Sequence, residues 1–148
     1  MFQIQLKDDF FYAEGTTDAI ICLNIDGTAF PDGEWTDFPV VVLNWWITAV
    51  LEASRKENGD FKLLFMDGPY AVNCHKEGGH VHLVGIRNPF DANSEVFCEG
   101  DATFGELVAA LIDAATELIR LIEEHQFSKL VDYDKLITSL AKLKVHQN

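Results

Sequence analysis

The chain has 148 residues, of which 48% are hydrophobic and 24% charged; this length suits one domain spanning 1–148, and the composition excludes wholesale disorder. Its formal net charge of −13 at pH 7 repels nucleic acid and anionic membrane surfaces and attracts basic proteins, so we expect no nucleic-acid or membrane role. A simpler interpretation stays open, in which the acidity only keeps the protein soluble.

The first part of the sequence predicts three strands. Apolar and polar residues alternate over 2–7, which is typical of a strand with one buried face. Asp8–Asp9 predicts a turn, and residues 10–14 predict a second short strand after it. The run 19–25 is apolar enough to lie centrally in a sheet, and the loop 26–34 follows it.

Residues 35–58 predict the helix around which the chain is organised. Asp37 is of a type that caps helix N-termini, and Pro39 lacks an N–H where a helix does not need one. Most of the circumference is apolar, so the helix must pack on several sides. Trp45 and Trp46 point about 100° apart on a helix, so the two can differ in burial. One narrow polar stripe runs along it: Asn44, Thr48, Glu52 and Arg55.

The rest of the chain predicts four strands and then two helices. The strands are expected at 61–66, 70–75, 80–87 and 95–99. Thr103 and Glu106 form a capping-box pattern at the start of an amphipathic helix that runs to about residue 125. A last amphipathic helix has acidic residues near its start and lysines near its end, as a helix dipole favours.

This order of elements predicts an α+β fold. Short turns join most of the strands, and only a few helical segments are long. We therefore expect two layers, with a mostly antiparallel sheet of about six to seven strands and the helices packed on one of its faces.

Three histidines make the first candidate site. With a hairpin loop over 76–79, His75 lies opposite His80 and Asn73 lies opposite His82, and all four share one sheet face. A loop with an odd number of residues would instead bring Cys74 opposite His82. Three imidazoles on one face could bind zinc in a small metal-binding protein or a metal-dependent hydrolase.

Other interpretations of these histidines stay open. No Asp or Glu lies at a spacing that would supply a general base, and the acidic character of the chain favours the protonated imidazole, which binds metal poorly. The three rings could also lie on a solvated sheet face or contact a polar ligand. We therefore expect no cofactor, with zinc on His75, His80 and His82 as the alternative.

The second candidate site is an acidic stretch between the third strand and the first helix. Its members are Asp26, Asp32, Glu34, Trp35 and Asp37. Their spacing does not match a calcium-binding loop, which places its ligands at alternate positions and closes with a glutamate. Turn formation and helix capping explain the aspartates one by one. The functional interpretation is an acidic patch, flanked by an aromatic residue, that docks a basic protein.

The cysteines and the first residues bear on location. Cys22, Cys74 and Cys98 are an odd number without a Cys-x-x-Cys pair, so they do not form a disulfide framework. Residues 1–7 lack the basic region and apolar core of a signal peptide. We therefore expect a cytoplasmic protein.

Three runs of the middle of the chain carry a resemblance. Residues 30–38, 41–46 and 65–70 resemble small uncharacterised bacterial proteins, some of which are similar to the immunity proteins of bacterial polymorphic toxin systems. Such a role implies a toxin-binding surface, and an acidic chain suits the inhibition of a basic toxin. The sequence has no catalytic motif, so we expect a non-enzymatic binding protein with a basic partner, whose oligomeric state stays open.

Overall fold

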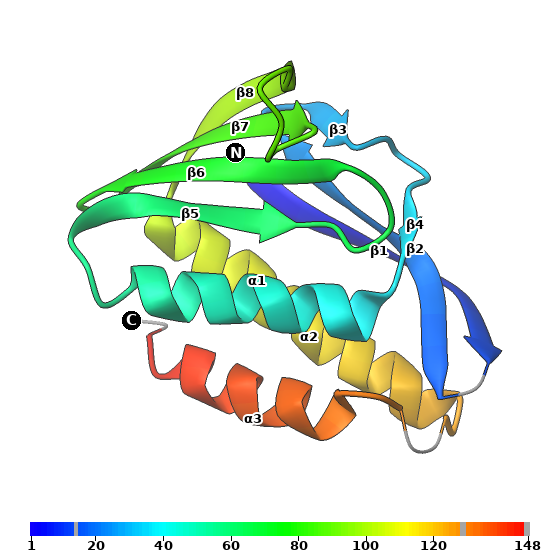
Figure 1. Cartoon of the computed structure of the whole chain (residues 1–148). Coiled ribbons are helices and arrows are strands. Elements are labelled where there is room, and N and C mark those ends of the chain that lie inside the picture. The colour runs from blue at the N-terminus through cyan, green and yellow to red at the C-terminus, as the bar shows by residue number, and fades with distance from the viewer. Residues whose placement is uncertain (14, 128–129, 147–148) are drawn as a thin grey trace.

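The computed structural model describes residues 1–13, 15–127 and 130–146 (Figure 1). The described residues form two four-stranded antiparallel sheets and three helices, which lie together on one side of the sheets. The first sheet has the order β1-β2-β3 with β4 also pairing with β2, and the second has the order β5-β6-β7-β8. The α+β class is confirmed, whereas the expectation of one sheet of six to seven strands is wrong. The strands are β1 (Phe2–Ala13), β2 (Thr16–Ile25), β3 (Thr28–Phe30), β4 (Thr36–Asp37), β5 (Asn58–Leu64), β6 (Tyr70–Glu77), β7 (His80–Arg87) and β8 (Glu95–Thr103).

The first two predicted strands are one strand. β1 continues through Asp8 and Asp9, where we expected a turn. Lys7 lies opposite Ile20 and Phe11 lies opposite Asp18, so the register shifts between these pairs. An irregularity of this kind accommodates extra residues in one strand while the ladder continues. The two aspartates therefore mark a bulge in a long hairpin.

Two glycines let the sheets approach each other closely. A Cβ atom on Gly85 would lie 2.6 Å from the Cys98 sulfur and 3.0 Å from the Phe30 ring, and one on Gly100 would lie 2.6 Å from a methyl group of Ile25. The N–H of Asp101, next to Gly100, donates to the Asp26 carboxylate at 3.0 Å. The end of β2 and the β2–β3 turn are thus held against β8 without a shared strand ladder, so the two sheets pack closely where they meet.

The first helix, α1 (Pro39–Ala53), is shorter than predicted. Pro39 begins it as expected, but Thr36 and Asp37 form strand β4 before it. Trp46 is fully buried and its indole N–H donates to the Leu64 carbonyl at 2.7 Å, whereas Trp45 is 39% exposed. The two tryptophans therefore differ in burial, and only Trp45 reaches the surface.

The other helices follow the sequence pattern closely. α2 (Phe104–Glu124) begins with the predicted capping box between Thr103 and Glu106, and its apolar face packs against β1. α3 (Tyr133–Lys144) packs on α1 and α2. In the part of the chain that the structure describes, no helix has the length and hydrophobicity that crossing a membrane requires.

Candidate functional site

The β6–β7 hairpin presents the histidines on the sheet face away from its buried residues, as predicted, but in a different register. His75 lies opposite His82, and Glu77 lies opposite His80. The expected pairing of His75 with His80 is wrong because the turn contains only Gly78 and Gly79. Gly78 has a φ of +59°, which lets two residues close the hairpin.

A buried lysine explains why the strand extends further than predicted. The Lys76 side chain is buried, and its ammonium donates to the carbonyls of Lys56 and Glu57 at 2.6 and 3.1 Å. It also lies 4.9 Å from the centre of the Phe104 ring. These contacts keep Lys76 in the ladder, so it does not enter the loop that we expected over 76–79.

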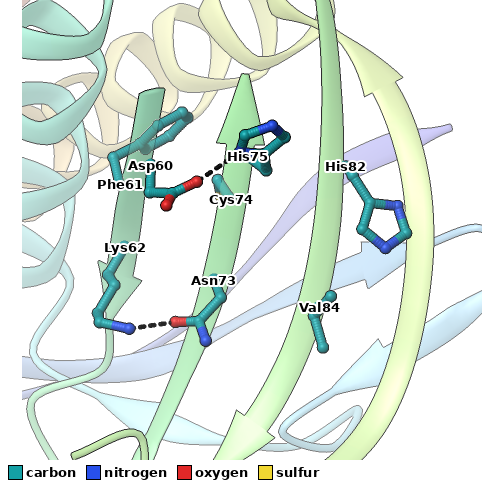
Figure 2. Close-up of a pocket in the computed structure, with 8 residues that line it drawn as sticks. All are labelled: Asp60, Phe61, Lys62, Asn73, Cys74, His75, His82 and Val84. Carbon is teal, nitrogen blue, oxygen red and sulfur yellow. Dashed lines mark hydrogen bonds and ion pairs between the residues drawn. The ribbon is translucent and has the colours of Figure 1, made fainter. Parts of the chain in front are cut away.

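A shallow hollow of about 340 Å³ lies on this face, between β5, β6 and β7 (Figure 2). His75 Nδ1 is 2.5 Å from a carboxylate oxygen of Asp60, and Lys62 donates to the Asn73 side chain at 2.5 Å. His82 lies on the neighbouring strand and projects from the same face. The hollow is therefore polar on the β5 side, where Asp60 pairs with His75 and Lys62 pairs with Asn73.

Carboxylates occupy both ring nitrogens of two histidines. His75 Nε2 is 3.1 Å from Glu77, and the two nitrogens of His82 are 3.1 and 3.2 Å from Asp101 and Glu99. The hydrogen bonds, with Asp60 first for His75 and Asp101 first for His82, raise the pKa of both imidazoles. A ring that donates from both nitrogens is protonated and has no lone pair for a metal ion.

His80 also pairs with a carboxylate. Its Nε2 is 2.9 Å from Asp101. Within residues 1–13, 15–127 and 130–146, no group of three or more His, Cys, Asp or Glu side chains converges to hold a metal ion. The zinc alternative on His75, His80 and His82 thus lacks a ligand set in the described structure, and the arrangement is a row of ion pairs on an exposed sheet face.

Two aspartates of the acidic stretch have partners within the fold, of which Asp37 is buried and Asp26 is exposed. Asp37 is 1% exposed, and its carboxylate accepts hydrogen bonds from four N–H groups around it. Asp26 binds the Met1 amine and the N–H of Asp101, and these contacts lower its pKa. Both carboxylates thus bind groups within the fold, and these contacts account for the two aspartates without a binding partner.

Asp32 and Glu34 are exposed, and Trp35 is partly buried. The Asp32 carboxylate accepts the Glu34 N–H at 2.8 Å, which is ordinary turn chemistry. Trp35 packs edge-on against Tyr70, with ring centres 5.2 Å apart. A Cβ atom on Gly68 would lie 2.7 Å from the Trp35 ring, so the β5–β6 turn rests directly on this indole.

An aromatic groove lies beside this stretch, and sequence reasoning missed it. It has a volume of about 620 Å³ and is open to solvent. Phe90, in the β7–β8 loop, is 79% exposed, and Trp45 reaches it from α1. A further wall consists of Gly68 and Pro69 from the β5–β6 turn and of Tyr70 at the start of β6. An open groove with two exposed aromatic side chains is a typical anchor site for a protein partner.

Carboxylates gather next to the groove. Asp67 adjoins the groove residue Gly68, and Asp91 lines the groove. Burial first, and then the negative charges of Asp67 and Asp37, raise the pKa of Asp18. Burial is the main cause of this shift, and repulsion from the two neighbouring carboxylates adds to it, so a cationic side chain near the exposed Asp67 would reduce only the second effect.

No family model, curated protein or solved structure matches this chain.

The groove joins segments that are distant in the sequence. Trp45 comes from a helix, Tyr70 from the start of a strand and Phe90 from a loop. The sequence offered one indication of the groove, which was that two adjacent tryptophans on a helix can differ in burial. The loop 88–93, which carries Phe90, has no pattern that predicts its place in the groove. The groove is lined mainly by apolar residues, with Tyr70, Asn88 and Asp91 as its polar members. Such a lining can hold an apolar group of a ligand that carries a positive charge next to it.

Proposed function

We propose that the protein is an acidic, non-enzymatic binding protein that receives a basic protein in the groove between Trp45 and Phe90, as an immunity-type inhibitor of a basic toxin would. The observation that carries this proposal is the exposed aromatic groove, with Asp91 in its lining and Asp67 next to it, in a chain of net charge −13. The three free thiols suit a protein of the reducing cytoplasm.

The aromatic side chains and the carboxylates around the groove would contribute to binding in different ways. Phe90 and Trp45 bury apolar area when a side chain of the partner enters the groove, at about 25 cal/mol for each Å² removed from water. The surrounding negative charge speeds the encounter with a basic protein and selects against acidic ones. Affinity would therefore depend on the aromatic side chains, and the association rate on the salt concentration.

The proposal can be tested with random twelve-residue peptides displayed on phage. Selection against the full chain should enrich peptides that carry an aromatic or aliphatic residue flanked by Lys or Arg. A selected peptide should bind the Phe90→Ser variant at least about tenfold more weakly, since the loss of a central aromatic anchor typically costs more than 1 kcal/mol.

Ile137→Ser is the matched control, because it removes an exposed apolar side chain from α3. It should leave peptide binding unchanged. The proposal would be wrong if the selected peptides lacked basic residues. It would also be wrong if wild type and Phe90→Ser bound a selected peptide equally well. For the immunity role, co-expression with a toxin from an adjacent gene should permit growth with wild type and fail with Phe90→Ser.

A further inference from the structure

A long strand edge lies open beside a helix. β1 pairs with β2 alone among the described strands, so its other edge carries no partner strand there. A groove of about 400 Å³ runs along β1, with residues 2–5 on one side and α2 on the other. Since successive side chains of a strand point to opposite faces, a groove lined by four consecutive residues follows the edge of the strand.

The backbone at this edge can form further hydrogen bonds. The Asp26 N–H donates to the Met1 carbonyl at 3.0 Å, which fixes the alternation of the β1–β2 ladder. Odd-numbered residues in this part of β1 therefore exchange hydrogen bonds with β2. The N–H and C=O groups of Phe2, Ile4 and Leu6 point the other way, to the free edge.

The helix forms a wall that suits an added strand. Glu106, Ala109, Ala110 and Asp113 line the groove at steps of three, one and three residues, which places them on one face of α2. The alanines leave space, and the carboxylates stand at the two ends. Residues 106 to 113 rise by about 10 Å along the helix. Residues 2 to 5 of β1 extend over about the same length.

We propose that this edge binds an extended basic segment of another protein as an additional strand of the first sheet. The backbone of β1 supplies the ladder, and Glu106 and Asp113 attract lysine or arginine side chains of the segment. A second copy of this chain fits less well, because two chains of net charge −13 repel each other. The inference goes beyond the proposed function, since it uses neither Phe90 nor Trp45.

The test uses a seven-residue peptide of alternating lysine and valine, with blocked ends and a fluorescent label. A second peptide has the same sequence and charge but is N-methylated on the edge that would face β1. The full chain should bind the unmethylated peptide at least about tenfold more tightly, because methylation removes the ladder donors. Equal affinity for the two peptides would overturn the proposal, since charge alone would then explain the binding.

Nuclear magnetic resonance locates the bound peptide. Amide shifts should concentrate on residues 2–6 of β1 and on the wall of α2, and shifts confined to other parts of the chain would contradict the proposal. A valine flanked by lysines also suits the aromatic groove, so the two peptides are compared again with the Phe90→Ser variant, in which the tenfold difference between them should persist. A failure of the groove proposal therefore leaves this result unchanged, and the two proposals stand or fall separately.

Two variants test the edge itself. Ile4→Pro removes an N–H that points to the free edge and keeps the bonds to β2, as proline requires at an edge strand. Asp113→Lys reverses a charge in the groove, and Glu123→Lys is its control about 15 Å further along α2. Ile4→Pro and Asp113→Lys should each weaken binding at least about tenfold, and Glu123→Lys should leave it near the wild-type value.

Should Ile4→Pro unfold, Asp113→Lys decides the outcome. Wild-type affinity in Asp113→Lys would refute the proposal. Sedimentation of the chain at several concentrations provides a further check. A dimer that Ile4→Pro converts to a monomer would show that a second copy fills the edge, and would replace the basic segment as its occupant.

Discussion

The indole N–H of Trp35 donates a hydrogen bond of 3.0 Å to Oδ2 of Asp37, two residues further along the chain. The same oxygen accepts the N–H groups of Met66 and Asp67 at 3.1 and 3.2 Å, and Oδ1 accepts the N–H of Phe38 at 2.8 Å. One buried carboxylate thus connects β4, the start of α1 and the β5–β6 turn. The β5–β6 turn forms one wall of the aromatic groove and α1 supplies Trp45, so Asp37 holds together two of the segments that line the groove.

Replacing Asp37 with alanine should strongly destabilise the fold. The substitution leaves four N–H donors without their acceptor, and hydrogen bonds to a charged group contribute about 1.5–3 kcal/mol each before the structure relaxes. We expect the free energy of unfolding in urea to fall by about 3 kcal/mol, together with a change in Trp35 fluorescence. Glu34→Ala, an exposed acid in the same stretch, should change it by less than about 0.5 kcal/mol. Equal stability of the two variants would contradict this role.

Alanine at position 100 should separate the two sheets. The new methyl group would lie 2.6 Å from the buried Ile25 and against the Asp26 carboxylate, so Ile25 must shift, or Asp26 must give up its contacts with the Met1 amine and the Asp101 N–H. Overpacking of this kind costs about 1–3 kcal/mol, which thermal unfolding would detect. Gly79→Ala is the control, because a Cβ atom there meets nothing within 4 Å. Equal melting temperatures of Gly100→Ala and Gly79→Ala would show that a methyl group fits between β8 and the end of β2.

The sequence predicted what local patterns determine. The Thr103 capping box, the apolar stripe of α2 and the start of α1 at Pro39 depend on neighbours within a few residues. The side of the hairpin that carries His75 and His82 also followed from alternation alone. These features need no knowledge of what packs against them.

Contacts between distant residues decided the rest. The close packing of the two sheets depends on Gly100 meeting Ile25, and the hairpin register depends on Lys76 reaching the carbonyl groups after α1. Asp37 was offered as a partner contact because two of its four donors, the N–H groups of Met66 and Asp67, come from a turn that the sequence does not place beside it. The groove escaped prediction for the same reason, since Phe90 sits in a loop with no periodic pattern.

Removing the Asp60 carboxylate should lower the pKa of His75. The hydrogen bond from the ring to Asp60 is the largest cause of the raised pKa of His75, and Glu77 is the next. We expect Asp60→Asn to shift the titration of His75 toward its ordinary value and to leave His82 unchanged, because other carboxylates hold that ring. Proton resonances of the two imidazoles, followed against pH, would measure both changes. An unchanged His75 titration would mean that the pair does not form in solution.

The His82–Asp101 pair should stabilise the fold only within a window of pH. Hydrogen bonding to Asp101 raises the pKa of His82, so that contribution is complete below the ordinary imidazole pKa and is lost as the pH rises through the folded value. The same contact lowers the pKa of Asp101, so the pair is also lost as the pH falls through the folded value of that carboxyl. Comparing wild type with His82→Gln in urea should therefore show the largest difference in mildly acid solution. A difference independent of pH would exclude the pair as its cause.

Neutralising Asp67 should affect stability and binding in opposite directions. Besides burial, the charges of Asp67 and Asp37 raise the pKa of Asp18, so Asp67→Asn removes a repulsion from the free protein. The pKa of Asp18 should fall, and the free energy of unfolding at neutral pH should rise slightly, within about 0.5 kcal/mol.

The same substitution should slow association with a basic peptide selected against the groove, because it removes a charge that steers the encounter. Glu123→Gln, which removes an equal charge from the far part of α2, should alter neither quantity appreciably. An association rate that Asp67→Asn leaves unchanged at low salt would show that the carboxylates beside the groove have no part in binding. If the protein instead tolerates repulsion between its own carboxylates because they attract its partner, Asp67→Asn should both raise the stability and slow the association.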